Sequence, residues 1–284
     1  MGKKRKDFWK VIKGIRKQRI RMQQRLIGYW CVVILTLFST AFLLLSIMGI
    51  IPGEDLKVRE MLSAQQKNTL SAMEEQTDIM MARSISLSED ITKELNQCLM
   101  VNGKAFSDLN DNSQLIMDLE AAIYPSLRSA LDVKYCSGVF VVLDATVNTG
   151  AECAETSRMG IYLRLSDLKA VNTSKQHVVF FRGNADIARA EQVQLHNRWN
   201  LEFDTSALPG YEQIMRFDGN RLVESCLWTD RLELSDTWED VQLLYVPVLD
   251  STGKVRGLCG MEMSNLYFRL SYPMVEGSCG NIVT

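Results

Sequence analysis

The stretch from Leu26 to Ile51 constrains this chain more than any other part of its sequence. It reads LIGYWCVVILTLFSTAFLLLSIMGII, and no charged residue occurs between Arg25 and Glu54. As a helix it would reach roughly 39 Å, at about 1.5 Å per residue, which is enough to cross a ~30 Å hydrocarbon layer with some tilt. It therefore predicts a transmembrane helix, because the core helix of a soluble domain is seldom apolar on every side. A cleaved signal peptide is a further alternative, although its apolar region would normally be shorter.

The charge of the chain differs on the two sides of this stretch. Residues 1–25 hold eleven Lys and Arg and a single acid, a net charge of +10, whereas the remainder holds 21 basic and 33 acidic residues, a net charge of -12. The positive-inside rule then predicts a cytoplasmic N-terminus, with residues 52–284 extracytoplasmic. The basic tail is expected at anionic headgroups. The acidic outer part argues against direct nucleic-acid contact by this chain.

A long amphipathic helix is predicted directly after the apolar stretch, over residues 54–100. Apolar and small residues recur there at spacings of three and four, no Pro interrupts them, and Gly103 stands where a helix would stop. One side of this helix is expected to pack on its own domain. The same periodicity also predicts a homodimer seam near the membrane.

A second helix is expected over residues 113–131. Asn112 or Ser113 can cap its first turn, and Pro125 should kink it or mark a restart.

Beyond Asp132 the sequence changes to runs of apolar and β-branched residues, which predict strands. Helices at the start and strands after them are typical of an α+β domain on an antiparallel sheet. The expected strands are 135–144, 160–165, 177–182, 223–232, 241–249 and 254–263, with short helices at 186–194, 207–217 and 265–270 and an irregular or extended segment at 195–203.

The sequence carries no recognisable motif for catalysis or for metal binding. No nucleophile elbow, P-loop or dinucleotide motif occurs, and His177 and His196 lack partners at any metal-binding spacing. The sequence thus predicts no enzyme, no cofactor and no metal, with a membrane-tethered hydrolase as a remote alternative. One cysteine, Cys31, lies in the apolar stretch, and the six others are expected to be mostly free thiols, although their even number permits disulfides.

The most specific local pattern is the run YVPVLDSTGKVRGLCGMEM at residues 245–263, which predicts a β-hairpin. Asp250 can bond the backbone of the turn, and Gly253 can take the positive φ that such a turn needs. Pro247 is confined to an edge position or a bulge, and Gly257 and Gly260 leave room for a close approach to the last strand.

This hairpin resembles that of the Cache family, the PAS-like extracytoplasmic sensor domains of bacterial receptors. The runs GVFVVLDATVNT, SRMGIYLRL, HNRWNLEFD and TWEDVQLLYVPVLD further resemble the sensor regions of membrane-bound AraC-type transcription regulators of anaerobic Gram-positive bacteria. The resemblance covers residues 54–272 and implies a membrane-anchored sensor that binds a small solute. Its parts would be a basic cytoplasmic tail (1–25), a transmembrane helix (26–51), a helical stalk and first part of the sensor (54–132), a Cache-like sheet (133–272) and a tail or the start of a further domain (273–284).

The family binds ligands on one side of its sheet, between aromatic and polar side chains. Its amino-acid-binding members carry an Arg-x-Trp-Tyr run, which the adjacent Arg198 and Trp199 do not reproduce, so that specificity is not implied. An arginine guanidinium can still bind a carboxylate with two hydrogen bonds, and a tryptophan ring can offer a flat apolar wall or a cation–π contact to a small ligand. The predicted ligand-binding residues are Arg198, Trp199, Trp228, Asp230, Trp238, Tyr245 and Tyr162. For each of them packing or a surface position is an equal alternative, and the rival hypothesis for the whole chain is an extracytoplasmic protein-interaction or scaffold module.

Overall fold

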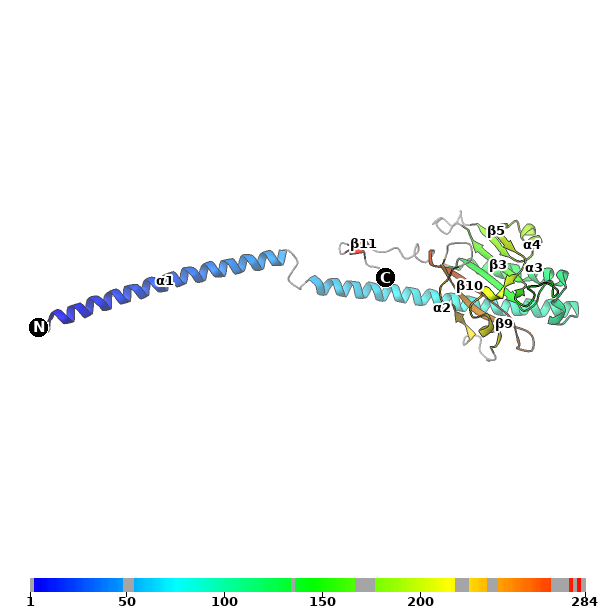
Figure 1. Cartoon of the computed structure of the whole chain (residues 1–284), viewed down its shortest axis with the longest axis horizontal. Helices are drawn as coiled ribbons and strands as arrows, with labels where there is room; N and C mark the ends of the chain where they lie inside the picture. Colours follow the sequence, from blue (N-terminus) through cyan, green and yellow to red (C-terminus); the bar gives the residue numbers. More distant parts are fainter. Residues whose placement is uncertain are drawn as a thin grey trace. The chain divides into compact units, whose positions relative to one another are not determined.

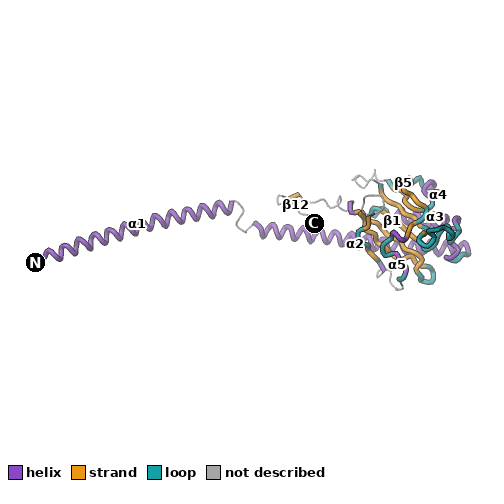
Figure 2. The backbone as a smooth tube through the Cα atoms, in the orientation of Figure 1, coloured by secondary structure: helices purple, strands orange, loops and turns teal. Residues whose placement is uncertain are grey.

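The fold is known here from a computed structural model, which describes residues 3–47, 54–133, 136–166, 177–217, 225–233, 240–266, 276–277 and 280–281. The chain divides into two units, Met1–Ser71 and Ala72–Thr284. The elements follow one another as shown in Figures 1 and 2: α1 (Lys3–Ile47), α2 (Glu54–Asn102), η1 (Phe106–Leu109), α3 (Ser113–Ala130), β1 (Gly138–Leu143), β2 (Ser157–Arg158), β3 (Gly160–Leu165), β4 (Val178–Arg182), α4 (Ala185–Ala190), β5 (Gln194–Asn200), β6 (Phe203–Asp204), η3 (Thr205–Ala207), α5 (Tyr211–Met215), β7 (Leu227–Trp228), β8 (Leu232–Glu233), β9 (Asp240–Leu249), β10 (Val255–Ser264), β11 (Glu276–Gly277) and β12 (Gly280–Asn281).

Helix α1 joins the basic tail and the apolar stretch in one continuous helix. Its segment Met22–Ile47 is long and apolar enough to cross a membrane, and no part of that segment is buried inside the protein. The Thr36 hydroxyl donates to the Val33 carbonyl at 2.8 Å, so this polar group of the apolar helix has a hydrogen-bond partner within the helix itself. The predicted N-terminal apolar helix is confirmed, while its expected last residues, 48–51, lie outside the described residues.

Helix α2 matches its predicted range and ends where Gly103 was expected to stop it. Gly103 has a φ of +60°, and its N–H donates to the Met100 carbonyl at 3.1 Å. Within the second unit, one stripe of α2 is buried, including Leu87, Ile91 and Leu95. This confirms that α2 packs on its own domain, whereas the homodimer seam stays a prediction.

Helix α3 begins after Asn112, whose side chain accepts a hydrogen bond from the Leu115 N–H at 3.1 Å. Pro125 lies inside the single helix Ser113–Ala130, so of the two predicted alternatives the restart does not occur, and the kink stays a prediction.

The main sheet of the second unit has the strand order β5-β4-β3-β1-β10-β9-β7, with β8 also paired to β9. All its described pairs are antiparallel except β4 and β5, which run parallel. The sheet is therefore mixed rather than purely antiparallel. The physical reason is α4, which carries the chain back along the sheet so that β5 can start beside the start of β4.

Side chains from the two faces of this sheet form two separate cores, because neighbouring residues on a strand point to opposite faces. On one face the sheet packs against α2 and α3, through residues such as Val141, Leu163 and Leu244. On the other face an aromatic cluster forms with α5. Its buried members are Phe140, Val142, Tyr162, Phe203, Tyr211, Ile214, Val241, Leu243, Tyr245 and Leu258.

The predicted hairpin is confirmed as β9 and β10. The Asp250 carboxylate accepts from the Thr252 N–H at 2.8 Å, and Gly253 has a φ of +80°. A Cβ on Gly260 would lie 1.7 Å from the Leu244 carbonyl oxygen, so the group that approaches this glycine is the neighbouring strand.

Pro247 lies on a stretch of β9 that β7 does not reach, since β7 pairs only with Leu244 and Tyr245. Helix α2 covers this edge in place of a strand. The Ser88 hydroxyl donates to the Pro247 carbonyl at 2.6 Å, and the Leu249 N–H donates to the Thr92 hydroxyl at 3.2 Å. Two backbone groups of an edge strand are thereby satisfied by side chains of a helix.

The substitution Ser88→Ala should destabilise the protein by about 1–3 kcal/mol, because it leaves the buried Pro247 carbonyl without a donor. Urea unfolding of the full-length protein in nanodiscs, followed by tryptophan fluorescence, measures the effect. Ser86→Ala, at a partly exposed position of the same helix, is the matched control. Equal destabilisation by the two variants would contradict the role given to Ser88.

Two local predictions differ from the structure. The helix expected at 186–194 ends at Ala190, whereas residues 194–200, part of the segment expected to be irregular or extended, form the strand β5. The strand expected at 223–232 is reduced to β7 and the start of β8, with residues 223–224 outside the described part. Of the helix expected at 265–270, residues 265–266 are helical, and residues 267–270 lie outside the described part. Of the six cysteines outside the apolar stretch, the five that the structure describes are free, and Cys279 lies outside the described residues.

Candidate functional site

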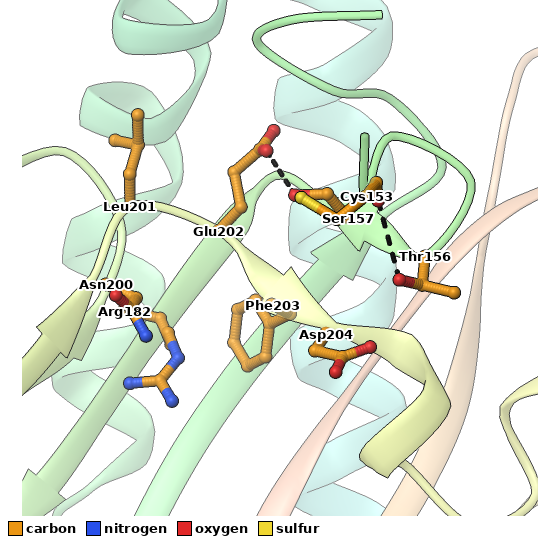
Figure 3. Close-up of a pocket in the computed structure, with 9 residues that line it drawn as sticks. All are labelled: Cys153, Thr156, Ser157, Arg182, Asn200, Leu201, Glu202, Phe203 and Asp204. Carbon is orange, nitrogen blue, oxygen red and sulfur yellow. Dashed lines mark hydrogen bonds between the residues drawn. The ribbon is translucent and has the colours of Figure 1, made fainter. Parts of the chain in front are cut away.

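A cavity of about 390 Å³ opens beside the ends of β4 and β5, and Figure 3 shows its described lining. The short ladder of β2 with β6 forms one wall, since Ser157 pairs with Asp204 and Arg158 with Phe203. The lining residues are Cys153, Thr156, Ser157, Arg182, Asn200, Leu201, Glu202, Phe203 and Asp204. A volume of this size lies within the range of small-molecule sites.

Arg182 is the one cation among the described lining residues. A register irregularity between β3 and β4 places Arg182 opposite Tyr162 and Phe180 opposite Leu163, which turns Arg182 away from the α2 and α3 face. Its Nη1 donates to the Phe181 carbonyl at 2.7 Å and to the Arg198 carbonyl at 3.0 Å. Within the described chain no carboxylate forms an ion pair with it. The guanidinium is half-buried and held at one nitrogen, which leaves the rest of its donor fork for a ligand.

Burial lowers the pKa of Arg182, and Tyr162 opposes this change. An arginine starts from so high a pKa that it stays charged at neutral pH. A partly desolvated cation that pairs with no carboxylate of the described chain favours the binding of an anionic ligand group beside it.

Glu202 lines the opposite wall, and protein donors already occupy both of its oxygens. Oε1 accepts from the Val147 N–H at 2.6 Å. Oε2 accepts from the Thr146 hydroxyl at 3.2 Å and from the Ser157 hydroxyl. Its carboxylate therefore organises the wall rather than offering free acceptors to a ligand.

Asp204 and Phe203 complete the cavity, and Figure 3 shows the Phe203 ring between Asp204 and Arg182. The Asp204 carboxylate accepts from the Ser206 N–H at 3.0 Å and hydroxyl at 2.6 Å, and the hydroxyl bond does most to lower the pKa of Asp204. Phe203 is buried and stacks with Tyr162 at a centroid distance of 6.1 Å. The cavity thus has a cationic side, an anionic side and an apolar floor.

Two of the sequence-predicted ligand residues lie on β5, close to this cavity but outside its lining. The Arg198 side chain is exposed, while its carbonyl holds Arg182. The Trp199 Nε1 donates to the Gly183 carbonyl at 2.9 Å, and its ring packs against the helix-side core. Trp199 therefore has a structural role in addition to any contact with a ligand.

Tyr162 and Tyr245 are buried in the aromatic cluster on the sheet. Tyr162 donates its hydroxyl to Glu262, and burial, together with that carboxylate, raises the pKa of Tyr162 well above its usual range. Tyr245 is fully buried and meets Phe140 edge-on at a centroid distance of 5.7 Å. Its hydroxyl has no hydrogen-bond partner among the described residues.

The remaining predicted residues are Trp228, Asp230 and Trp238. Trp228 is half-buried on β7, Asp230 is exposed, and Trp238 lies outside the described residues. The structure thus gathers none of the described predicted residues around one cavity, and their role in ligand binding stays a prediction.

A buried polar network on the aromatic face was missed by reasoning from the sequence. Arg164 Nη2 donates to Glu262 Oε1 at 2.8 Å, and Arg164 Nε donates to Oε2 at 2.9 Å. The Ser137 hydroxyl adds a 2.6 Å bond to Oε1. Single charges inside otherwise apolar strands, Arg164 in GIYLRL and Glu262 in GLCGMEM, were the available signal, as was Arg182 at the end of HVVFFR.

Glu120 is a second buried carboxylate, on α3, and no cation pairs with it among the described residues. Its side chain is 2% exposed, and its Oε2 accepts from the Asn184 N–H at 2.9 Å. Burial raises the pKa of Glu120 to about 8, and the backbone N–H groups of Asn184 and Gly160 counteract part of the rise. The carboxyl group thus joins α3 to the loops before β3 and α4.

Among the residues described, no group of three His, Cys, Asp or Glu side chains is arranged to hold a metal ion.

Comparisons with known proteins give a similarity to a solved structure. No protein-family model and no curated protein sequence matches the chain. Among solved structures, the chain is similar to the periplasmic sensory domain of the Campylobacter jejuni chemoreceptor Tlp1, with 13% sequence identity and a TM-score of 0.43. The match covers 76% of this chain and 63% of that chain, which is less than two thirds of the chemoreceptor structure. The architecture of this chain is an α+β fold with an N-terminal apolar helix and a mixed sheet.

Proposed function

We propose that the chain is a membrane-anchored extracytoplasmic sensor that binds a small solute with a carboxylate group and signals across the membrane. The observation that carries the proposal is Arg182. Its half-buried guanidinium lines a cavity of about 390 Å³, is oriented by two backbone carbonyls and pairs with no carboxylate of the described chain. A carboxylate ligand would supply the missing partner in bidentate form.

The membrane placement in this proposal rests on two features of the sequence. The segment Met22–Ile47 can cross a membrane, and the charge of +10 before it and -12 after residue 25 favours a cytoplasmic N-terminus. The Cache resemblance agrees with a sensor on the outside and with an output, such as transcription regulation, on a further part of the receptor.

In this proposal, helix α2 carries the signal between the sheet of the sensor domain and the membrane. It is one continuous helix from Glu54 to Asn102, and its buried stripe belongs to the core that supports the sheet. A ligand can bias such an element only through different affinities for two arrangements of the domain.

Titration of the full-length protein in nanodiscs with acetate, lactate, succinate and benzoate tests the proposal. We expect binding of at least one of them, and Arg182→Gln should raise its Kd roughly 10- to 100-fold, because a hydrogen bond to a charged group is worth about 1.5–3 kcal/mol. Arg189→Gln is the matched control, since Arg189 is an exposed arginine on α4 paired with Asp186.

The outcomes separate the two hypotheses for the chain. Binding that is equally strong in Arg182→Gln would move the site away from this cavity. A folded protein that binds no small solute at millimolar concentration would favour the alternative, an extracytoplasmic protein-interaction module.

A further inference from the structure

The cavity wall formed by Glu202 continues into a chain of hydrogen bonds that leaves the cavity. Glu202 receives the Ser157 hydroxyl from the cavity side, and the Val147 N–H and Thr146 hydroxyl from the loop after β1. The loop that runs from Asp144 to Thr149 is therefore fixed to the cavity wall through one carboxylate.

The same loop holds the turn between η1 and α3 on its other side. The Thr146 N–H donates to the Asn110 side chain at 3.0 Å, and the Asp111 N–H donates to the Thr146 carbonyl at 3.1 Å. Thr149 then binds both carboxylate oxygens of Asp111, through its N–H at 2.7 Å and its hydroxyl at 2.6 Å. Thr146 is thus bonded to the cavity wall and to this turn at once.

Asp111 is the point of this turn where the backbone is least relaxed. Its φ is +58°, in the left-handed region that residues with a side chain seldom adopt. Such a conformation persists only where surrounding contacts hold it, and here the contacts come from Thr146 and Thr149. The turn lies between the end of α2, eight residues earlier at Gly103, and the cap of α3 at Asn112.

We propose that Glu202 is a positioning residue that couples the cavity wall to the conformation of Asp111 in the connection between α2 and α3. If the hydrogen bond between Ser157 and Glu202 is changed, the Glu202 carboxylate moves. The loop 144–149, which this carboxylate holds, then contacts Asp111 differently. The turn then loses the contacts that keep φ positive, and the restraint on the end of α2 weakens. The use of this coupling in signalling rests on the proposed function. The coupling itself exists in the protein without ligand.

Amide hydrogen exchange of the ligand-free, full-length protein in nanodiscs tests the coupling. In Glu202→Gln we expect the amides of Asp111, Thr146 and Thr149 to exchange about tenfold faster, while the amides of β1 and β10 keep their protection. Ser157→Ala should show the same local effect at Asp111, although Ser157 does not touch the turn. Ser157→Thr, which keeps the hydroxyl, should restore the wild-type rates.

The matched control is Asp204→Asn, a carboxylate of the same cavity whose side chain is bonded to Ser206 and, among the described residues, makes no hydrogen bond to the loop 144–149. In Asp204→Asn the Asp111 amide should exchange its hydrogen at the same rate as in the wild type. The proposal is overturned if Glu202→Gln and Ser157→Ala leave Asp111 unchanged, if all three variants act alike, or if exchange rises uniformly over the sheet. Because no ligand is present, these results are independent of the titration that tests the proposed function.

Discussion

Glu120→Gln should make the protein more stable than the wild type above about pH 8 and should flatten the dependence of its stability on pH. The reason is the position of the Glu120 carboxyl on α3, where it is almost fully buried without a cationic partner among the described residues. Burial raises the pKa of Glu120 to about 8 from an ordinary value of 4.5. Ionisation in the folded state is therefore unfavourable, and a neutral amide avoids it.

The sign of the effect follows from proton binding. Between pH 4.5 and about 8 the folded protein holds the Glu120 proton and the unfolded chain releases it. The free energy of unfolding that this group contributes is fully present below the unfolded pKa and is lost as the pH rises through the folded pKa. At 1.36 kcal/mol for each pKa unit, the contribution is roughly 5 kcal/mol as an upper bound.

Urea unfolding of the full-length protein in nanodiscs at about pH 5 and about pH 9 measures this contribution. The difference in stability between Glu120→Gln and the wild type should shift in favour of the variant by roughly 3–5 kcal/mol over this interval. Asp118→Asn is the control, because Asp118 is an exposed acid on the same helix, two residues away. Parallel pH profiles for Glu120→Gln and the wild type would show that Glu120 is ionised in the folded protein without cost.

Glu262→Gln should destabilise the protein by about 3–5 kcal/mol at neutral pH, because it removes the buried carboxylate that pairs with the guanidinium of Arg164. The side chain of Glu262 is 0% exposed and that of Arg164 is 6% exposed, and the two are joined by bonds of 2.8 and 2.9 Å. Tyr162 and Ser137 would also lose a charged acceptor. The double variant Arg164→Met/Glu262→Leu should lose less than the sum of the single variants Arg164→Met and Glu262→Leu, since it removes both buried charges.

Denaturant unfolding of the single and double variants gives the interaction energy directly. The control is Glu212→Gln, because the Glu212 and Arg216 side chains form an ion pair in which they are 76% and 79% exposed. This substitution should change the free energy of unfolding by less than about 1 kcal/mol. A loss for Glu262→Gln as small as that for Glu212→Gln would mean that water reaches the buried pair.

The parts of the fold that could be predicted are those with a long and uniform pattern. The α2 range and the β9–β10 hairpin follow from periodicity, from Gly103 and Gly253 at their ends, and from Asp250 in the turn. For the strand β5 the sequence left an irregular and an extended segment open, because LHNRWN has no alternation. Its place is fixed by tertiary contacts such as the bond from Trp199 to the Gly183 carbonyl.

The cavity was less predictable than the fold, for a physical reason. Trp228, Tyr245 and Arg198 were singled out by residue type, yet type does not say which face of a strand a side chain occupies. Arg182 reaches the cavity only because of an irregular register between β3 and β4, and Glu202 does so because the short ladder of β2 with β6 brings it to Ser157. Features of one or two residues in length leave no periodic trace in a sequence.

The way in which α2 covers β9 limits what the sheet can bind. Ser88 and Thr92 occupy the carbonyl of Pro247 and the N–H of Leu249, which are the groups that an added β-strand would need. While α2 stays in place, a peptide or a second copy of the chain cannot extend the sheet there. Any movement of α2 that breaks these two bonds would uncover a short open edge, so coverage by α2 and addition of a strand are mutually exclusive states of the same surface.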